Sequence, residues 1–470
     1  MSATRKECRR GTARSAVVAV LIVICLLSAA CTRAIEGQAA PTPTEFDGRQ
    51  PGPIAQVVGG KNSRTDALAA NVVAGAEGYW RRKFPEVFNR QWVNIHGFFA
   101  IDPKTSKPPP CVKQASDMTD QATYCPALDT LAWDRVELLP RLVRQYGPAA
   151  VLFALSHEMG HAVENRLGID ASTQLDLPDR YPTILLEGMA DCYAGSVMNA
   201  VVAGTVPKVS MSPGDVDHAL QALISFRDPI SGIGTVPLRP HGDAFDRISA
   251  FIDGYTGGPM NCSGMTVQNQ VFTARGYSSL YDQAVGGNLE LPDLLTLLGP
   301  DVSTWLGSVV TGKGRQWSAP RLVVGGSSTC SLEGIAGQGG VRFCPATNVI
   351  AVSSSGLGDI HDRLGDYASG AVVVSRYAIA ALSALGHPVR GAAASTSVLC
   401  LTGAYTRAIF DRADGFTLSP GDIDEAVHEL LEQNFVARDV TGAAPPGDLG
   451  LTRISQFRTG VLGGAAKCGL

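Results

Sequence analysis

The second half of this 470-residue chain repeats the first half in sequence, and this repeat limits the folds that the chain can adopt. Matching segments occur in the same order in both halves, and their offset falls only from 219 to 206 residues. The matches are Cys111–Ala132 with Cys330–Ala351, Cys192–Gly195 with Cys400–Gly403, Ser212–Asp217 with Ser419–Asp424, Arg247–Phe251 with Arg453–Phe457, and Cys262 with Cys468. A period of about 200 residues is the size of a domain rather than of a solenoid repeat. We therefore expect two tandem homologous domains, residues 60–262 and 286–470, joined by a linker over 263–285.

A metal-ligand motif occurs in the first copy. The sequence Ser-His-Glu-Met-Gly-His lies in an apolar segment that is predicted to be helical from Pro148 and to end at Gly168. His157 and His161 are four residues apart, so on a helix they share one face and can bind one ion. Glu158 lies beside them, where it can accept a proton from a water molecule that the metal activates.

A second predicted helix, from Ile184 to Val202, offers the third ligand. It carries Glu187 and Asp191 on one face. Two nitrogens and the Glu187 oxygen would leave one tetrahedral position open on zinc, as in catalytic rather than structural sites. We expect Asp191 to accept a hydrogen bond from the free ring N–H of a ligand histidine, which fixes its tautomer. The alternative is a chance His-Glu-x-x-His on a helix surface, and the downstream Glu187 and Asp191 count against it.

Residues 60–262 resemble the bacterial neutral zinc metallopeptidase family. The matching segments are His157–Gly168, Leu186–Gly195, Cys111, Tyr124–Pro126, His241–Gly242, Asp246–Arg247 and Cys262. The resemblance implies a zinc peptidase with one Zn²⁺ per chain. It implies that His157, His161 and Glu187 are the metal ligands and that Glu158 is the general base.

The resemblance also assigns a second catalytic role and shows one departure. His241 matches the histidine of the family's His-Gly motif and is our candidate donor to the oxyanion, with Tyr193 and Arg247 as alternatives. The other interpretation of His241 is a loop histidine that caps the following helix. The family usually has a histidine directly after the second ligand histidine, where this chain has Ala162. This change leaves the ligands intact and affects only finer features of the site.

The second copy lacks these ligands. The positions of His157, Glu158, His161, Glu187 and Asp191 are taken by Arg376, Tyr377, Ala380, Ser395 and Leu399. Arginine and alanine do not bind zinc, so we expect no metal site of this type there. His361, His387 and His428 have no partner at ligand spacing and are interpreted as surface or core histidines. The possible roles of this copy are a structural partner, a substrate-binding surface, a regulator and a domain that simply packs on the first.

The predicted order of elements is the same in both copies. A helical stretch around a tryptophan is followed by a strand-like run, a cysteine loop, a second strand-like run and helices. The paired segments are Trp80 with Trp305, residues 91–100 with 321–324, and residues 130–136 with 349–352. This order predicts a helix-dominated α+β fold with two tandem zincin-like domains, the second without a metal site. By analogy we expect residues 91–100 to form a cleft edge where an extended peptide pairs.

The cysteines favour an exported protein with disulfides. Eight cysteines follow Cys31, four in each copy, and an even count is typical of oxidised exported domains. Because the pairing should be the same in both copies, we predict four bridges of two kinds. They are Cys111–Cys125, Cys192–Cys262, Cys330–Cys344 and Cys400–Cys468. Metal binding by these cysteines is the weaker alternative, because the chain has no Cys-x-x-Cys pair.

The N-terminus is typical of a bacterial export signal. Residues 1–30 combine a basic start with a short apolar run, Ala16–Leu27. Small residues before Cys31 resemble a lipobox, with Ser28 where leucine is commoner, so we predict lipidation of Cys31 and a lipid anchor on the outer face of the cytoplasmic membrane. A cleaved signal of a secreted protein and an uncleaved anchor are the alternatives. The Pro-rich residues 31–59 are predicted to be a flexible tether.

The charge and the motifs together indicate a peptidase. Loss of residues 1–30 removes five basic residues and one acidic residue, which takes the formal net charge from −4 to −8 and argues against nucleic acid as a partner. The predicted function is zinc-dependent hydrolysis of a peptide or protein substrate outside the cytoplasmic membrane. The alternatives are a surface lipoprotein that binds a partner without cleaving it and a zinc amidase that acts on cell-wall peptide crosslinks.

Overall fold

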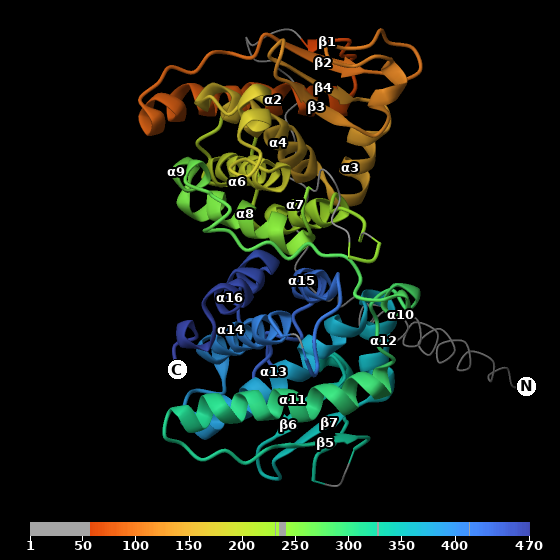
Figure 1. Cartoon of the computed structure of the whole chain (residues 1–470), viewed down its shortest axis with the longest axis vertical. Coiled ribbons are helices and arrows are strands. Elements are labelled where there is room, and N and C mark those ends of the chain that lie inside the picture. Colours follow the sequence, from red (N-terminus) through yellow and green to blue (C-terminus); the bar gives the residue numbers. More distant parts are fainter. Residues whose placement is uncertain (1–56, 231, 235–240, 327–328, 413) are drawn as a thin grey trace, which may run out of the picture. The chain divides into compact units, whose positions relative to one another are not determined.

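The computed structural model describes residues 57–470 except 231, 235–240, 327–328 and 413 (Figure 1). The described residues belong to one compact unit. The predicted signal peptide, the lipidation site Cys31 and nearly all of the tether lie outside the described residues. Below, residues 57–265 are called the first half and residues 266–470 the second half.

The first half opens with a helix and a small mixed sheet. Helix α2 (Arg64–Phe88) follows β1 (Val57–Val58), and the sheet has the order β1-β2-β4-β3. Its other strands are β2 (Gly97–Ile101), β3 (Ala122–Cys125) and β4 (Thr130–Asp134). Strand β2 is parallel to β1 and β4, whereas β3 is antiparallel to β4 and forms a free edge.

The expectation that residues 91–100 form the edge of the cleft was therefore wrong. Strand β2 begins only at Gly97 and lies inside the sheet, hydrogen-bonded on both sides. Its Phe98 and Ala100 are buried in the core, and a strand with such side chains is favoured in the interior of a sheet. Strand β3 is the edge strand that faces the cleft described below.

Helices make up the rest of the first half. They are α3 (Leu138–Tyr146), α4 (Pro148–Leu167), α5 (Ala171–Asp176), α6 (Thr183–Val202), α7 (Pro213–Ser225), α8 (Ala244–Gly257) and α9 (Pro259–Ser263), with a 3₁₀ turn η1 (Ala115–Met118) before β3. Helix α4 starts with Pro148 at its first turn and is ended by Gly168 in the left-handed conformation, as the sequence predicts. Helices α4 and α6 are almost entirely buried, so both carry polar residues into the interior.

The second half has the same order of strands and helices. Its sheet, β5-β7-β6, pairs parallel and then antiparallel, as β2-β4-β3 does. The elements are α10 (Leu280–Ala284), α11 (Leu291–Gly312), β5 (Arg321–Val324), η2 (Ala336–Gln338), β6 (Val341–Cys344), β7 (Val349–Val352), α12 (Ser354–Leu364), α13 (Asp366–Leu385), α14 (Gly391–Phe410), α15 (Asp422–Glu432), α16 (Gly450–Gly463) and η3 (Ala465–Lys467). The prediction of a helix-dominated α+β fold is confirmed.

Matching glycines let one helix pair approach closely in each half. A Cβ atom on Gly254 of α8 would lie 1.7 Å from the carbonyl oxygen of Cys192 in α6. On Gly460 of α16 it would lie 1.8 Å from the carbonyl oxygen of Cys400 in α14. Any larger residue would force these backbones apart, so both crossings depend on glycine.

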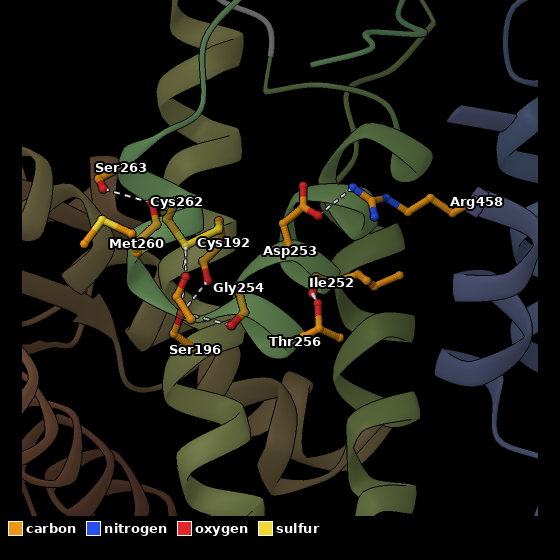
Figure 2. Close-up of a disulfide and its surroundings, with 11 residues drawn as sticks. Cys192, Ser196, Ile252, Asp253, Gly254, Thr256, Met260, Cys262, Ser263 and Arg458 are labelled. Carbon is orange, nitrogen blue, oxygen red and sulfur yellow. Dashed lines mark hydrogen bonds and ion pairs between the residues drawn. A yellow bond between two sulfur atoms is a disulfide. The ribbon is translucent and has the colours of Figure 1, made fainter. Parts of the chain in front are cut away.

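The four disulfides have the predicted pairing. Figure 2 shows Cys192 of α6 joined to Cys262 of α9, beside the crossing of α6 with α8. Cys400 and Cys468 make the matching bridge in the second half. The first of these bridges holds the helix that carries Glu187.

Removal of the Cys192–Cys262 bridge is expected to cost stability. The bridge closes a loop of 70 residues, so the double change Cys192→Ala with Cys262→Ala should lower the free energy of unfolding by about 4 kcal/mol in the chain-entropy model. The Cys111–Cys125 bridge closes a loop of 14 residues, so its removal by the matched double change should cost about 3 kcal/mol. Guanidinium denaturation of the oxidised proteins measures both, and an unchanged midpoint for the first pair would contradict the prediction.

One helix in the described part of the chain, α13 (Asp366–Leu385), is long and apolar enough to cross a membrane. It is 89% buried within the protein over its most apolar window, and the core helix of a soluble protein shows the same pattern.

Candidate metal centre

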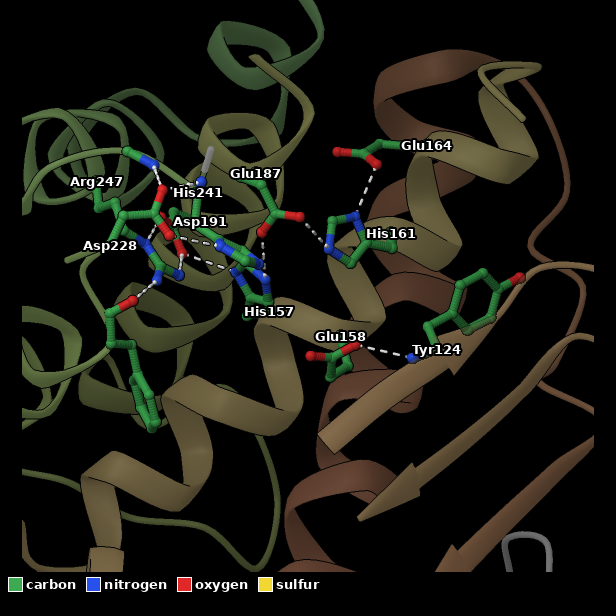
Figure 3. Close-up of polar contacts among 12 residues, drawn as sticks. Tyr124, His157, Glu158, His161, Glu164, Glu187, Asp191, Asp228, His241 and Arg247 are labelled. Carbon is green, nitrogen blue, oxygen red and sulfur yellow. Dashed lines mark hydrogen bonds and ion pairs between the residues drawn. The ribbon is translucent and has the colours of Figure 1, made fainter. Parts of the chain in front are cut away.

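Helices α4 and α6 bring the three predicted ligands to one point (Figure 3). The Nε2 atom of His157 lies 3.2 Å from Oε2 of Glu187, and Nε2 of His161 lies 3.8 Å from Oε1 of the same carboxylate. One donor atom from each residue lies within 4.8 Å of the other two. The arrangement follows from the four-residue spacing on α4, which puts both imidazoles on the face that packs against α6.

The geometry fits zinc. A tetrahedral ion with bonds of about 2.0–2.1 Å holds its ligand atoms roughly 3.3 Å apart. The two histidine nitrogens lie 3.2 Å and 3.8 Å from the nearer oxygens of Glu187. Two imidazole nitrogens and one carboxylate oxygen are a ligand set of catalytic zinc sites, in which the fourth position is left open. His157, His161 and Glu187 would therefore hold the ion without a large rearrangement.

A carboxylate orients each histidine from behind. Nδ1 of His157 lies 2.7 Å from Oδ1 of Asp191, the contact predicted from the sequence. Nδ1 of His161 lies 2.9 Å from Oε2 of Glu164, a residue that the sequence reasoning missed. Glu164 is three residues after His161 on the buried side of α4, and a charged residue on an apolar helix face is the signal that could have revealed it. These contacts leave both Nε2 atoms free for a metal.

The Asp191 carboxylate is itself fixed by an arginine. Nε of Arg247 donates to Oδ2 at 2.8 Å and Nη2 to Oδ1 at 2.9 Å, while Nη1 donates to the carbonyl oxygen of Phe226. Burial acts to raise the pKa of Asp191, but the charges of Arg247 and His157 outweigh it and hold this pKa below its usual range. Arg247 is thus engaged with Asp191. Tyr193, the other alternative oxyanion donor, is fully buried against Trp80 and is not among the residues that line the cleft.

The site favours positive charge. Burial lowers the pKa of His157, but the charge of Asp191 and hydrogen bonds with Asp191 and Glu187 raise it to about 10. Burial also acts to lower the pKa of His161, but the carboxylates of Glu164 and Glu187 outweigh it and raise this pKa to about 9. Burial acts to raise the pKa of Glu187, yet the two histidines hold it far below the usual range. These carboxylates surround two imidazoles and favour a cation there, whether protons or a metal ion supply the charge.

The ligands line a cleft with a volume of about 1210 Å³. Glu158 also lines it, and its Oε2 accepts a hydrogen bond from the main-chain N–H of Tyr124 at 2.8 Å. Tyr124 belongs to β3, so the free edge of the sheet forms one wall of the cleft beside the expected base (Figure 3). The cleft thus brings together the expected general base, the three predicted ligands and an open strand edge.

His241 lines the same cleft. Its Nδ1 lies 2.9 Å from Oδ1 of Asp228, and Asp228 also accepts the main-chain N–H groups of His241 and Gly242. The side chain is about half exposed. The ring is paired with Asp228 rather than with the N-terminus of α8, so the interpretation of His241 as a helix cap was wrong.

An arginine fills the corresponding position of the second half. Arg376 is buried and donates to the carbonyl oxygens of Val341, Gln338, Phe435 and Arg438. Tyr377 and Ala380 beside it are also buried.

A second group of metal-ligand type in the described residues consists of Asp366, Asp422 and Glu425. Each accepts a main-chain N–H, from Leu289, Ser419 and Tyr367 respectively. Glu425 caps the first turn of α13 and Asp422 closes the turn before α15, while Asp366 holds the segment before α11, so each carboxylate already has a main-chain partner.

Two histidines four residues apart on one helix, a glutamate from the next helix and an adjacent carboxylate in a cleft are the residue types from which zinc hydrolases build their sites. Comparison with known proteins agrees with this class. The chain belongs to the family described as "putative neutral zinc metallopeptidase", whose sequence profile matches residues 7–265.

Similar curated proteins are uncharacterized. Proteins of Mycobacterium tuberculosis and Mycobacterium bovis are 32% identical over 158 residues, which cover 30% of this chain and 53% of each relative. The chain thus spans about half the length of the curated relatives that it matches. No solved structure matches this chain.

Proposed function

We propose that the first half is a zinc-dependent peptidase that hydrolyses peptide bonds outside the cytoplasmic membrane. The observation that carries the proposal is the convergence of His157, His161 and Glu187 with both Nδ1 atoms held by carboxylates. A purely structural metal site would not need an open position, a cleft or a non-ligand carboxylate next to the ligands. Family membership supports the same chemistry.

The residues around the site supply the remaining chemistry. Bound zinc would lower the pKa of water from 15.7 to about 7 and polarise the scissile carbonyl. Glu158 accepts the proton of the attacking water and delivers it to the leaving amine. His241 is positioned by Asp228 in the cleft wall and donates to the oxyanion.

Strand β3 is the proposed substrate-binding edge. Among the described strands it pairs with β4 alone, so its other side can pair with an extended peptide. The N–H of Tyr124 on this side is held by Glu158. Substrate binding would replace this contact and free the Glu158 carboxylate for its role as base.

The proposed location is the outer face of the cytoplasmic membrane, through a lipid on Cys31. The basic and apolar N-terminal sequence supports export, and four disulfides are typical of proteins that fold in an oxidising compartment. We also infer that the two halves are homologous domains. The shared strand order and the matching glycine crossings support this inference.

Metal analysis combined with cleavage profiling tests the function. The chain from residue 32 to 470 should contain one zinc per molecule and should cleave members of a peptide library, and a chelator should stop the cleavage. His161→Ala should lose both zinc and activity. Cleavage of cell-wall crosslinks alone would identify an amidase, and zinc without cleavage of either substrate would identify a binding protein; each result would overturn the proposal.

A further inference from the structure

The two halves contact each other through a pair of equivalent aspartates. The segment Ser-Pro-Gly-Asp-Val-Asp ends at Asp217 in α7, and its repeat Ser-Pro-Gly-Asp-Ile-Asp ends at Asp424 in α15. These two residues therefore occupy the same position in the repeat. Each of them reaches across to a helix of the other half.

Each aspartate caps the first two residues of a helix. The Asp217 carboxylate accepts the N–H groups of Gly450 at 2.7 Å and Leu451 at 2.8 Å, where α16 begins. The Asp424 carboxylate accepts those of Ala244 at 3.1 Å and Phe245 at 3.0 Å, where α8 begins. Neither helix has a side-chain cap from its own preceding residue. Each half therefore supplies an acceptor that the other half lacks.

The exchange has the form of a twofold interface within one chain. In an isologous dimer, residue i of one subunit contacts residue j of the other, and j contacts i. Here α7 caps α16, and its counterpart α15 caps α8, which is the counterpart of α16. Further contacts hold α8 against α16. Arg458 Nη2 lies 2.7 Å from Oδ1 of Asp253 (Figure 2), and the same guanidinium contacts Ser249.

The consequences of the two caps differ. Helix α8 carries Arg247, which holds Asp191, which in turn holds the His157 ring. Asp424 is therefore connected to His157 through the start of α8, then Arg247, then Asp191.

Helix α16 carries the matching Arg453. This arginine donates to the carbonyl oxygens of Leu430 and Leu431 and pairs with Asp448. Leu399 stands where Asp191 would be, so no comparable path leaves Asp217.

Asp424 also holds the segment before α8. Its Oδ2 accepts a hydrogen bond from Nη1 of Arg227 at 3.0 Å. The neighbouring Phe226 carbonyl accepts from Arg247, and the neighbouring Asp228 positions His241. One carboxylate of the second half is thus linked, through groups of the first half, to both His157 and His241.

The Asp424 carboxylate is buried among hydrogen-bond donors. It is 4% exposed and receives three N–H donors, one of them from a guanidinium. Burial raises the pKa of the neighbouring Asp243 to about 8, and the negative charge of Asp424 adds to this shift. Burial similarly raises the pKa of Asp246 to about 7. Asp424 accepts a hydrogen bond from a guanidinium, whereas Asp246 accepts from the main chain and hydroxyl of Thr273.

We propose that the second half is a built-in partner that orients the metal centre, with Asp424 as the positioning residue. This inference rests on the proposed function of the first half. It assigns a role to a domain that has lost its own ligands. The role is to fix α8, and through Arg247 and Asp191 the His157 imidazole, by a cap that the first half does not contain.

The two aspartates provide a matched pair of variants. Asp424→Asn and Asp217→Asn remove the same charge from the same position of the repeat and should lower the melting temperature by similar amounts. Only Asp424→Asn should weaken zinc binding, by roughly 10-fold, because it loosens a partner of a ligand histidine. It should lower kcat more than it changes KM, and Asp424→Glu should restore part of the loss. Asp217→Asn should leave zinc affinity and kcat within about 2-fold.

Competition with a chelating dye measures zinc affinity, and hydrogen exchange of α6 and α8 gives a readout that needs no metal. Faster exchange around Asp191 in Asp424→Asn but not in Asp217→Asn is expected. Equal effects of both variants, or none from Asp424→Asn, would overturn the inference. If Asp424→Asn does not fold, Asp424→Ser keeps an oxygen acceptor and is the second variant. If the wild type binds no zinc or cleaves no peptide, the proposed function fails, whereas the exchange comparison still decides this inference.

Discussion

Replacement of Glu158 with glutamine is expected to lower kcat for peptide cleavage by about 10²–10⁴-fold while one zinc per chain is retained. Glutamine has nearly the same shape but accepts no proton from water at neutral pH. Glu158 is not among the converging ligand atoms, so the metal should stay bound. Its carboxylate contacts the main chain of Tyr124, and the glutamine oxygen can make the same contact.

Steady-state kinetics and metal analysis of the same preparation test this expectation. Glu86→Gln is a suitable control, because Glu86 is an exposed glutamate of α2 paired with Lys83 and should tolerate the change. If Glu158→Gln cleaved at the wild-type rate, another group would have to be the base. Loss of zinc together with activity would instead make Glu158 part of the metal centre.

Replacement of Asp191 with leucine, the residue at the matching position of the second half, should strongly lower both stability and zinc affinity. It leaves the buried Arg247 guanidinium without its carboxylate, and breaking a buried pair in this way costs about 3–5 kcal/mol. It also removes the acceptor for Nδ1 of His157, which should weaken zinc binding by about 10–100-fold.

A double variant separates the two effects. Asp191→Leu with Arg247→Met removes both charges and should recover most of the lost free energy of unfolding, because no unpaired charge remains. Zinc affinity should stay low, since His157 still lacks its acceptor. Chemical denaturation and zinc competition measure the two quantities. Recovery of zinc affinity in the double variant would show that Asp191 acts only on stability.

Local sequence signals predicted the parts of this protein that depend on nearby residues. Pro148 and Gly168 gave the ends of α4 because both act through their own backbone conformation. The spacing of His157 and His161 predicted a shared face because the helical period is fixed. The disulfide pairing followed from the repeat, which reduced a combinatorial problem to two kinds of bridge.

Features that depend on long-range packing were not predicted. The order of the strands is set by pairing between distant segments, so β3 rather than the run before Ile101 became the edge. The role of Glu164 depends on the rotation of the His161 ring, and that of Arg247 on how α8 lies against α6. A charged residue on an apolar helix face indicates a buried partner, but the sequence does not say which residue that partner is without the fold.

Each half caps the start of a helix in the other half, so neither half contains all of the caps that its own helices use. A fragment cut after α9 would keep every zinc ligand, yet it would leave the first amides of α8 to water and uncover Phe245, which packs against Phe457 with ring centres 6.5 Å apart. Such fragments are therefore expected to cleave peptides more slowly than the full chain and to self-associate. In a molecule with a single copy, water, another side chain or a second molecule would have to supply the acceptor for these amides.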